Sequence, residues 1–480
     1  MCFPYVINAQ GWFQTFPIVE GQAMTATVDG GFVVAGRSGG PNCSAIDDAH
    51  LTKLDADGLL VWSNTFGGTI NRDDAITIAP TADGGYVAAG SSNSFGPSAD
   101  LFVFKADNNG RALWSRTFGG PDGDRAVHIT PSNDGGFLLT GCFDCFNQSA
   151  PSQLYTVRID ANGNSLWART YNVAVEGYAA IATDDGGFAI ASVSDNTVPD
   201  NLAQLILVRI DSDGNTLWNA AFGSDTLYNA QSILKTPRGF ALAGNCRLPG
   251  RFDTDIYLIQ TDENGQLLQR NFYGGSEGDQ IYDLLQLSDG GFAMTGLTAS
   301  SGDTLGDVYL VRTQADGNQA WELFYGNTQW QETGRATIET ADGGLVVTGT
   351  RRIKTGPLTS SESEVILLKT EANGRIGNRL IRGYLREDQN SDCTAQDNEA
   401  PLAGWKVALR NGAESQYTTT DDSGYYELLV VEDDYDLRFV APSSYWGDCS
   451  GPISLTIDDS QDTFHLAAAF SKANLCPELA

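Results

Sequence analysis

The chain has 480 residues, enough for two or more domains with a large buried core. Its formal net charge is −31, from 60 acidic residues against 29 Lys and Arg. This charge argues against nucleic acid or an anionic membrane surface as a partner, because both need clustered basic residues. No apolar run of about 18 residues occurs, so no segment is expected to insert into a membrane.

The N-terminal residues 1–9 are largely apolar and end in the small residue Ala9 before Gln10. This pattern is typical of the end of a secretory signal peptide, although the basic start and most of the apolar core are absent. We interpret residues 1–9 as a remnant of a signal peptide and expect a secreted or cell-surface protein. Such a location permits disulfides. The candidate cysteines are Cys142 with Cys145, which would staple one loop, and Cys393 with Cys449.

Two short motifs recur in step along the first three quarters of the chain. Asp-Gly-Gly followed by an apolar residue begins at Asp29, Asp83, Asp134, Asp185, Asp289 and Asp342, and the degenerate Pro237-Arg-Gly-Phe240 fills the gap. Asp-x-x-Gly, or a close variant, follows in each unit and leads to Trp62, Trp114, Trp167, Trp218 and Trp321, whereas one unit has Leu268 where the Trp is missing. The period of 51 to 54 residues is typical of solenoids, propellers and arrays.

Each unit predicts four strands joined by tight turns. In the first unit the strands are residues 23–28, 32–36, 50–54 and 60–66. Gly in the connecting motifs supplies the positive φ that tight hairpins need. The second strand of each unit is apolar on both faces, so it must lie between packed layers. Four-stranded sheets that stack radially in this way form a β-propeller.

The two ends of the repeat region complement each other. Residues 12–16 match a fourth strand without the rest of its unit, and the unit from Thr333 to Lys369 lacks a good fourth strand. Pairing these two segments closes the ring and removes both free edges. We therefore predict an all-β fold with a seven-bladed β-propeller over residues 10–380, whose last blade is completed by the N-terminal strand.

The repeat resembles two known groups of proteins. Asp-x-x-Gly-x-x-x-Trp is similar to the repeat of quinoprotein dehydrogenases, which are typically eight-bladed and bind their quinone beside adjacent cysteines. Seven predicted blades and no adjacent cysteines imply here the repeat alone, with no organic cofactor. The longer pattern, from Asp-Gly-Gly to the Phe-Gly-Gly after the Trp, resembles large secreted proteins of Bacteroidota that use the type IX secretion system.

Binding is expected on the face of the ring that carries the variable loops. The near-constant turns lie on one face, and the loops after the second and fourth strands differ in every unit on the other. A ring of polar residues lies just before the first strands and would line the mouth on that face: Gln22, Asp74, Arg125, Tyr178, Asn229, Gln280 and Arg335. This set suits an extracellular glycan or a protein segment. The alternatives are a mouth that is merely solvated and a sialidase-like cluster of Arg72, Arg125 and Arg335, which lacks a matched nucleophile.

The pattern changes near Ile381. Short alternating strands with turns every 8 to 12 residues predict a small β-sandwich over residues 381–472. We interpret residues 473–480 as the start of a linker to a downstream region.

One loop of this second region has the spacing of calcium ligands. Oxygen-bearing side chains stand at positions 1, 3, 5, 9 and 12 of the stretch that runs from Asp388 to Glu399. The predicted ligands are Asp388, Asn390, Asp392, the carbonyl of Thr394, and Glu399. Cys393 replaces the usual Gly at position 6, and no flanking helices are expected, so this is not an EF-hand. A plain acidic loop is the alternative.

The segments around this loop resemble an SdrD B-like domain. They are residues 383–390, 399–409 and 419–426. Such domains are calcium-stabilised, immunoglobulin-like modules of bacterial surface adhesins, and the resemblance implies a calcium-stiffened stalk. We expect a non-enzymatic recognition or adhesion protein. The alternatives are a propeller enzyme, glycan-processing or quinoprotein-like, and a structural scaffold with no ligand.

Overall fold

The computed structural model is all-β, and no helix occurs among the residues that it describes. It describes residues 12–472 apart from 17–19, 39–47, 57, 69–71, 97, 146–151, 195–202, 224–226, 249, 252, 301–305, 327–329, 354–362, 373, 375–378, 391–394, 397, 412–413, 431–432, 441–445, 449–452 and 458–462. The proposed cleavage site after Ala9 and the proposed linker 473–480 therefore lie outside the described residues.

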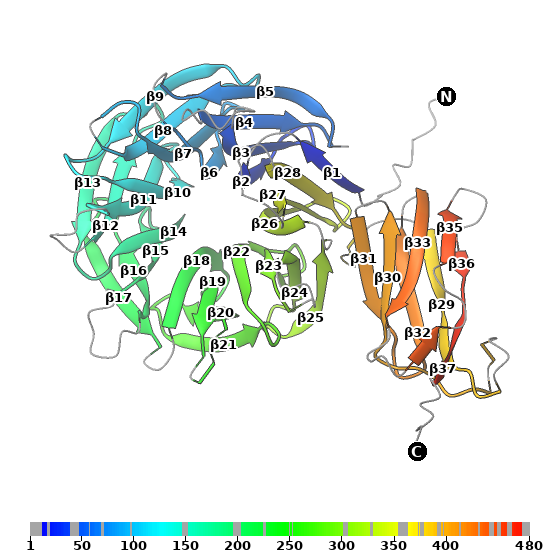
Figure 1. Ribbon diagram of the computed structural model, residues 1–480. Coiled ribbons are helices and arrows are strands. Elements are labelled where there is room, and N and C mark those ends of the chain that lie inside the picture. Colours follow the sequence, from blue (N-terminus) through cyan, green and yellow to red (C-terminus); the bar gives the residue numbers. More distant parts are fainter. Residues whose placement is uncertain are drawn as a thin grey trace, which may run out of the picture.

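Residues 12–369 form seven four-stranded antiparallel sheets arranged as a ring (Figure 1). The first three contain β2 (Glu20–Ala26), β3 (Phe32–Ser38), β4 (Asp48–Leu54) and β5 (Leu60–Phe66); β6 (Thr77–Pro80), β7 (Tyr86–Ser92), β8 (Asp100–Ala106) and β9 (Ala112–Phe118); and β10 (Arg125–Pro131), β11 (Phe137–Phe143), β12 (Gln153–Ile159) and β13 (Ser165–Tyr171). The next three contain β14 (Glu176–Ala182), β15 (Phe188–Val193), β16 (Leu205–Ile210) and β17 (Thr216–Phe222); β18 (Leu227–Thr236), β19 (Gly239–Arg247), β20 (Asp255–Asp262) and β21 (Leu267–Tyr273); and β22 (Asp279–Gln286), β23 (Phe292–Thr298), β24 (Asp307–Thr313) and β25 (Gln319–Tyr325).

The seventh sheet joins the two ends of the repeat region. Its order is β1 (Trp12–Phe16), β28 (Ser363–Lys369), β27 (Leu345–Ile353) and β26 (Trp330–Glu339). Trp12 lies opposite Lys369 and Phe16 opposite Val365, so the N-terminal strand completes the last sheet as the sequence predicts. This pairing leaves neither β1 nor β28 as a free end of the ring.

The repeated Trp and the repeated Gly are parts of one contact between neighbouring sheets. Trp62 donates a hydrogen bond from Nε1 to the Asn108 carbonyl of the next sheet, at 3.2 Å. Its ring lies against Gly110, whose φ is 77°, and a Cβ there would stand 2.7 Å from the Trp62 ring. Gly110 is therefore required twice, by its positive φ and by the indole. In β21 the equivalent position is Gln269, opposite Gln260, and not Leu268 as the motif suggested.

The Asp of each Asp-Gly-Gly turn forms an ion pair that the sequence analysis missed. It meets a Lys or Arg from the third strand of its own sheet in six units: Asp29–Lys53, Asp83–Lys105, Asp134–Arg158, Asp185–Arg209, Asp289–Arg312 and Asp342–Lys369. The hydrogen bond from Lys105 is the largest cause that lowers the pKa of Asp83, to about 2. The β18–β21 sheet has lost both partners together, because Pro237 stands in the turn and Gln260 takes the basic position.

Residues 379–472 form two further sheets. One orders β32 (Tyr425–Val430), β29 (Arg379–Glu387), β37 (Ala468–Lys472) and β34 (Trp446–Asp448), with β36 (Thr463–His465) also paired to β29. The other orders β31 (Glu414–Thr419), β30 (Lys406–Asn411), β33 (Asp433–Val440) and β35 (Ile453–Ile457). The sheets share one hydrophobic core, with Ile381, Tyr426 and Phe470 from the first and Val407 and Leu437 from the second. β29 pairs in parallel with β36 and β37, so the first sheet is mixed.

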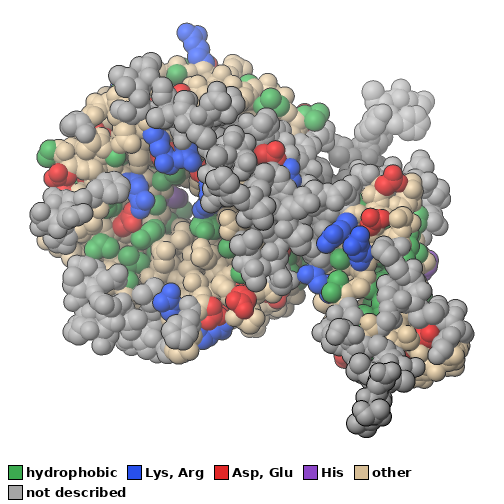
Figure 2. All heavy atoms as spheres, in the orientation of Figure 1, with side chains coloured by type: hydrophobic (Ala, Val, Ile, Leu, Met, Phe, Trp, Pro, Cys, Tyr) green, Lys and Arg blue, Asp and Glu red, His purple; other side chains and the backbone are tan. Residues whose placement is uncertain are grey.

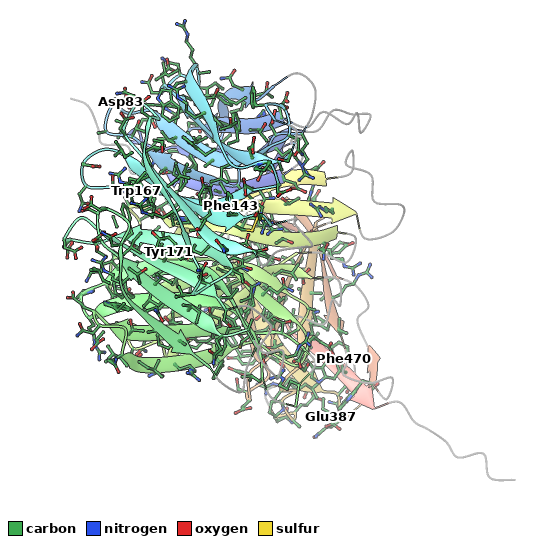
Figure 3. All side chains as sticks on the ribbon, turned by 90° about the vertical axis from the view of Figure 1, so that its left-hand side faces the viewer. Asp83, Phe143, Trp167, Tyr171, Glu387 and Phe470 are labelled. Carbon is green, nitrogen blue, oxygen red and sulfur yellow. A yellow bond between two sulfur atoms is a disulfide. The ribbon has the colours of Figure 1, made fainter. Side chains whose placement is uncertain are left out.

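The two faces of the ring carry different parts of each unit. Antiparallel order places the turns between the first and second strands, and between the third and fourth, at the same end of every sheet. Figure 3 shows Asp83, in one of these turns, and Phe143, at the end of a second strand, toward opposite faces. We call them the turn face and the mouth face.

Candidate functional site

The seven predicted mouth residues lie near the starts of the first strands, but at two levels. Gln22, Tyr178 and Arg335 are the extra residues of β-bulges in β2, β14 and β26. Bulges are a common means of redirecting a side chain at the rim of a barrel or beside a site.

The other four residues lie two positions before the repeat position that is bulged in the other units. They are Asp74, Arg125, Asn229 and Gln280. The bulged residues of the β10, β18 and β22 strands are instead Val127, Gln231 and Tyr282. The mouth is therefore lined by two rows of residues, and the sequence prediction drew some members from each.

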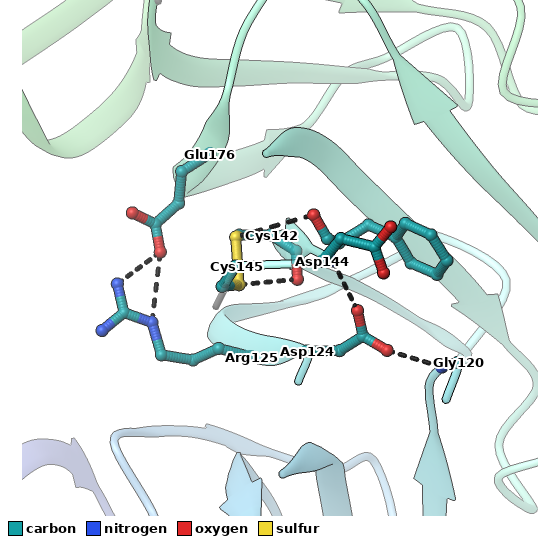
Figure 4. Close-up of a disulfide and its surroundings, with 8 residues drawn as sticks. Gly120, Asp124, Arg125, Cys142, Asp144, Cys145 and Glu176 are labelled. Carbon is teal, nitrogen blue, oxygen red and sulfur yellow. Dashed lines mark hydrogen bonds and ion pairs between the residues drawn. A yellow bond between two sulfur atoms is a disulfide. The ribbon is translucent and has the colours of Figure 1, made fainter. Parts of the chain in front are cut away.

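Glu176 interacts with two of the predicted residues, Arg125 and Tyr178, and Figure 4 shows its carboxylate against Arg125. Its Oε1 accepts hydrogen bonds from Arg125 Nε, at 3.1 Å, and from Arg125 Nη2. It also interacts with the hydroxyl of Tyr178, whose pKa is raised first by burial and then by the charge of Glu176. Tyr178 thus remains a neutral hydrogen-bonding group at any physiological pH.

Asp74 lies on the next unit and is surrounded by arginines. Its Oδ1 accepts a hydrogen bond from the Ser91 backbone N–H at 2.7 Å, and its Oδ2 lies 3.8 Å from Arg72 Nη2. Burial raises the pKa of Asp74, while the charges of Arg72, Arg37 and Arg125 act in the opposite direction. The carboxylate therefore pairs with Arg72 and lies within the electrostatic reach of Arg37 and Arg125 of the two adjacent units.

Glu20 forms the other end of this chain of charges. Its carboxylate pairs with Arg37 at 3.0 Å and with Arg352, and it accepts a hydrogen bond from Gln22 Nε2 at 2.9 Å. We define the arginine arc as Arg37, Arg72, Arg125 and Arg352 together with the carboxylates of Glu20, Asp74 and Glu176. It follows the mouth from the β26–β28 sheet to the β14–β17 sheet.

The remaining side of the mouth is polar with one cation. Tyr282 donates from its hydroxyl to Gln280 Oε1 at 2.9 Å, and the Arg335 guanidinium lies 3.9 Å from the centre of the Tyr282 ring, as a cation–π pair. The Oδ1 atom of Asn229 is buried and has no hydrogen-bond partner among the described residues. Such an acceptor gains from a ligand that donates to it.

Positive charge exceeds negative charge within the arc itself. Together with Arg335, its side chains are five arginines and three carboxylates, an excess of two positive charges (5 − 3) among these eight residues of a chain of net −31. Figure 2 shows Lys and Arg side chains on this face around the centre of the ring. Arg72, Arg125 and Arg335 do not converge as the sialidase-like alternative requires, since Arg335 stacks on Tyr282 on the other side.

A disulfide stands directly beside the arc. Cys142 and Cys145 are joined, and Cys142 lies opposite Arg125 in the β10–β11 pair (Figure 4). Asp124 fastens the same loop, because its Oδ1 accepts from the Asp144 backbone N–H at 2.8 Å and its Oδ2 from Gly120 N–H at 2.5 Å. The disulfide loop and the Arg125 guanidinium are therefore held by two consecutive residues, Asp124 and Arg125, at the start of β10. Cys393 and Cys449 lie outside the described residues.

The predicted calcium loop is described only in part. Asp388 and Glu399 are buried, and both Glu399 oxygens accept backbone N–H groups, from Gln389 at 3.1 Å and Gln396 at 3.0 Å. Asn390 is described, whereas Asp392 and Thr394 are not. In the described part of the chain no three His, Cys, Asp or Glu side chains come together as a metal site. Two buried carboxylates at the two ends of the loop are compatible with a hard cation such as calcium.

Sequence reasoning missed Glu20, Glu176 and Tyr282. These residues could have been aligned by counting back from the Asp-Gly-Gly turn. The bulged residue lies seven positions before the Asp of the turn in four units, where it is Gln22, Tyr178, Tyr282 and Arg335. Glu20 and Glu176 then fall on the same row as Arg125. The ion pairs between units carry no such local signal.

No family model matches the chain. It is 40% identical over 68 residues to "Serine-aspartate repeat-containing protein F" of Staphylococcus epidermidis, a match that covers 14% of this chain and 4% of that protein. A second strain of that species has a protein of the same name that is 38% identical over 68 residues. The chain therefore spans a small fraction of the length of the curated relatives it matches.

Several solved structures are similar at low identity. A Dyadobacter fermentans protein of unknown function is 14% identical, with a TM-score of 0.42, over 76% of this chain and 96% of that one. The WD40 domain of Neurospora crassa Pan2 is 9% identical, with a TM-score of 0.41, over 76% and 97%. A Bacteroides caccae protein of unknown function is 14% identical, with a TM-score of 0.40, over 61% and 93%.

No helix with the length and apolar character needed to cross a membrane occurs among the described residues.

Proposed function

We propose that this chain is a secreted or cell-surface recognition protein whose ring is a seven-bladed β-propeller that binds an extracellular glycan or protein segment at its mouth. The observation that carries the proposal is the arginine arc. In a chain of net −31, four arginines alternate with three carboxylates along one side of the mouth. An acidic glycan, or an acidic protein segment, is the ligand class that this excess charge favours.

The arrangement favours recognition over turnover. The arc carboxylates accept hydrogen bonds or ion pairs from arginines, from a backbone N–H or from a side-chain amide, so each serves as an acceptor that positions its neighbours. General acid and base catalysis needs instead a pair of groups with separated proton affinities beside the substrate. We therefore propose a non-enzymatic role, in which the arc supplies charge-assisted hydrogen bonds and Tyr282 an aromatic surface.

We propose residues 381–472 as an immunoglobulin-like stalk stiffened by calcium at the 388–399 loop. The shared core of the two sheets supports an independent sandwich. The resemblance to SdrD B-like modules is supported by the 68-residue match to a serine-aspartate repeat-containing protein. Secretion through a type IX system in Bacteroidota stays a prediction.

A glycan array tests the proposed ligand. The full chain, in calcium buffer, is expected to retain acidic glycans, and the signal should fall with added salt because exposed ion pairs are screened. Arg125→Ala and Tyr178→Ala should both lose the signal. An array on which no glycan binds would contradict the glycan form of the proposal, and pull-down with acidic cell-surface proteins would then test the protein form. Salt-insensitive binding to neutral glycans alone would contradict the role of the arc.

A further inference from the structure

The turn face contains a pocket between two neighbouring sheets of the ring. It lies where β17 of one sheet meets β18, β19 and the β20–β21 turn of the next, and its volume is about 260 Å³. Trp218 and Phe240 line it, and Asp184, Lys235, Glu263 and Asn264 surround them. It is on the opposite face from the mouth, so it is independent of the function proposed above.

The seven units serve as internal controls for this junction. Lys235 takes a strand position that is occupied elsewhere by Ala, Pro, Gln or Glu (Ala26, Pro80, Pro131, Ala182, Gln286 and Glu339). Glu263 takes a turn position that is occupied elsewhere by Ala, Asn or Ser (Ala56, Asn108, Ala161, Ser212, Ala315 and Ala372). The two side chains pair at 2.8 Å. This ion pair is therefore specific to the junction and not a feature of the repeat.

The ion pair of the Asp-Gly-Gly turn is retained at this junction, because Asp185 and Arg209 pair there and line the pocket. The loss of that ion pair in the β18–β21 sheet lies at its other junction, where Gln260 donates to the Ala315 carbonyl of the following sheet at 3.2 Å. Lys235 and Glu263 are thus the departures from the repeat that face the pocket, and they indicate a local role beyond the packing of the ring.

The floor of the pocket is aromatic. Trp218 and Phe240 meet edge to face, with centroids 6.4 Å apart at 60°, and Lys235 Nζ lies 5.7 Å from the Phe240 centroid. Trp62 and Trp167 donate from Nε1 to a carbonyl of the next sheet. No such bond is found among the described residues from Trp114, Trp218 or Trp321, so its absence is not specific to this junction.

The rim alternates donors and acceptors. Lys235 and the Asn264 amide donate, while Asp184, Glu263 and the Asn264 carbonyl accept. Three carboxylates (Asp184, Asp185 and Glu263) stand against two cations (Arg209 and Lys235), so the local charge is −1 and an anionic ligand is disfavoured. Seven of the ten lining residues are polar or charged, so this pocket is more polar than a usual small-molecule site and suits a ligand rich in hydroxyls. The volume is below the roughly 300 Å³ at which sites for drug-sized ligands begin.

We propose that this pocket binds a single neutral pyranose unit, with its C–H face on Trp218 and its hydroxyls bonded to Lys235, Glu263 and Asn264. A pyranose has both an apolar face and a ring of hydroxyls that donate and accept. The proposal thus gives the chain a second binding site, of different ligand chemistry from the mouth.

The test uses the full chain and a panel of methyl glycosides of glucose, galactose and mannose, titrated by ligand-observed NMR. At least one glycoside is expected to bind at millimolar concentration. Trp218→Gln and Glu263→Ala should each weaken it at least tenfold. Both replacements are native at the same repeat position of other units, Gln269 and Ala315, so folding should be retained, and thermal melting checks this.

Matched controls separate this site from the mouth and from structural effects. Trp167→Gln and Asn108→Ala change the same repeat positions in other sheets and should leave binding unchanged, as should Arg125→Ala at the mouth. Failure of every glycoside to bind would overturn the proposal. So would binding that survives Trp218→Gln and Glu263→Ala, or binding that is lost with Arg125→Ala, which would assign the sugar to the mouth.

Discussion

Glu20 and Arg352 form an ion pair although 332 positions separate them in the chain. Glu20 opens the first strand of the first sheet, and Arg352 is the penultimate residue of the second strand of the last sheet. The ring is thus closed at two places, because β1 pairs with β28 at the outer edge of the last sheet while this ion pair joins first and last sheets at the mouth. Glu20 and Arg352 therefore contribute both to the closure of the ring and to the candidate binding surface.

Deletion of residues 11–17 should destabilise the whole ring. The deletion removes β1, which pairs with β28 over five residues, and exposes the edge of β28. At about 1 kcal/mol for each lost backbone hydrogen bond, the melting temperature should fall by roughly 5–10 °C. Differential scanning calorimetry of the full and shortened chains measures this. An unchanged melting temperature would show that β1 does not hold the ring closed.

Arg158→Gln should destabilise the ring by about 2–3 kcal/mol. Arg158 is 4% exposed and donates to the Phe137 carbonyl at 3.1 Å and to Ser132 Oγ at 2.6 Å, besides its pair with Asp134. Loss of a buried charged donor leaves these acceptors unpaired. Urea unfolding measures the change. Arg116→Gln, at an exposed position, is the control and should shift stability by no more than about 0.5 kcal/mol.

Stability should fall as the pH drops from about 6.5 to about 4. Burial lowers the pKa of both His50 and His128 from 6.5 to about 4. Between these two pKa values the unfolded chain binds more protons than the folded chain, so acid favours unfolding. The free energy of unfolding is therefore highest above pH 6.5, where both histidines are neutral in both states. The loss should reach about 3 kcal/mol for each histidine. His128→Gln should flatten the curve of unfolding free energy against pH, and an equally steep curve in the variant would contradict this origin.

Calcium should raise the melting temperature of the transition that belongs to residues 381–472. A ligand at 100 times its dissociation constant adds about 2.7 kcal/mol to stability. Glu399→Gln should abolish the calcium response, whereas Asp422→Asn, at an exposed turn, should retain it. Scanning calorimetry with calcium and with a chelator measures both. Equal melting temperatures in calcium and chelator for the parent chain would exclude this loop as a stabilising calcium site.

The repeat made the ring predictable because each unit repeats the same local physics. Gly110 and Trp62 illustrate this, since a turn that needs a positive φ and an indole that needs an open backbone occur together at five junctions of the ring. β1 was predictable from its motif alone. By contrast, β29 was missed, because Arg382 and Arg386 interrupt its apolar pattern and two of its partners, β36 and β37, lie about 80 residues away.

The candidate site was predictable only in outline. The order of the turns predicts which strand starts face the mouth. The bulges are not predictable in this way, and because each one shifts the register by one residue, Gln22 and Glu20 lie in different rows of the mouth. Pairs such as Arg125–Glu176 join units 51 residues apart, and nothing local to either residue indicates its partner. The ion pairs of the turn face could have been found, since Pro237 and Gln260 depart from the repeat together.

The most direct measurement compares two arginine variants in binding to the strongest acidic glycan of the array. Arg72 is half exposed at the mouth beside Asp74, and Arg111 is exposed in a turn on the opposite face. If the arginine arc binds the ligand, Arg72→Ala should weaken binding about tenfold, which is about 1.4 kcal/mol, while Arg111→Ala should bind as the parent chain does. Equal affinities for the parent and both variants would contradict recognition at the mouth.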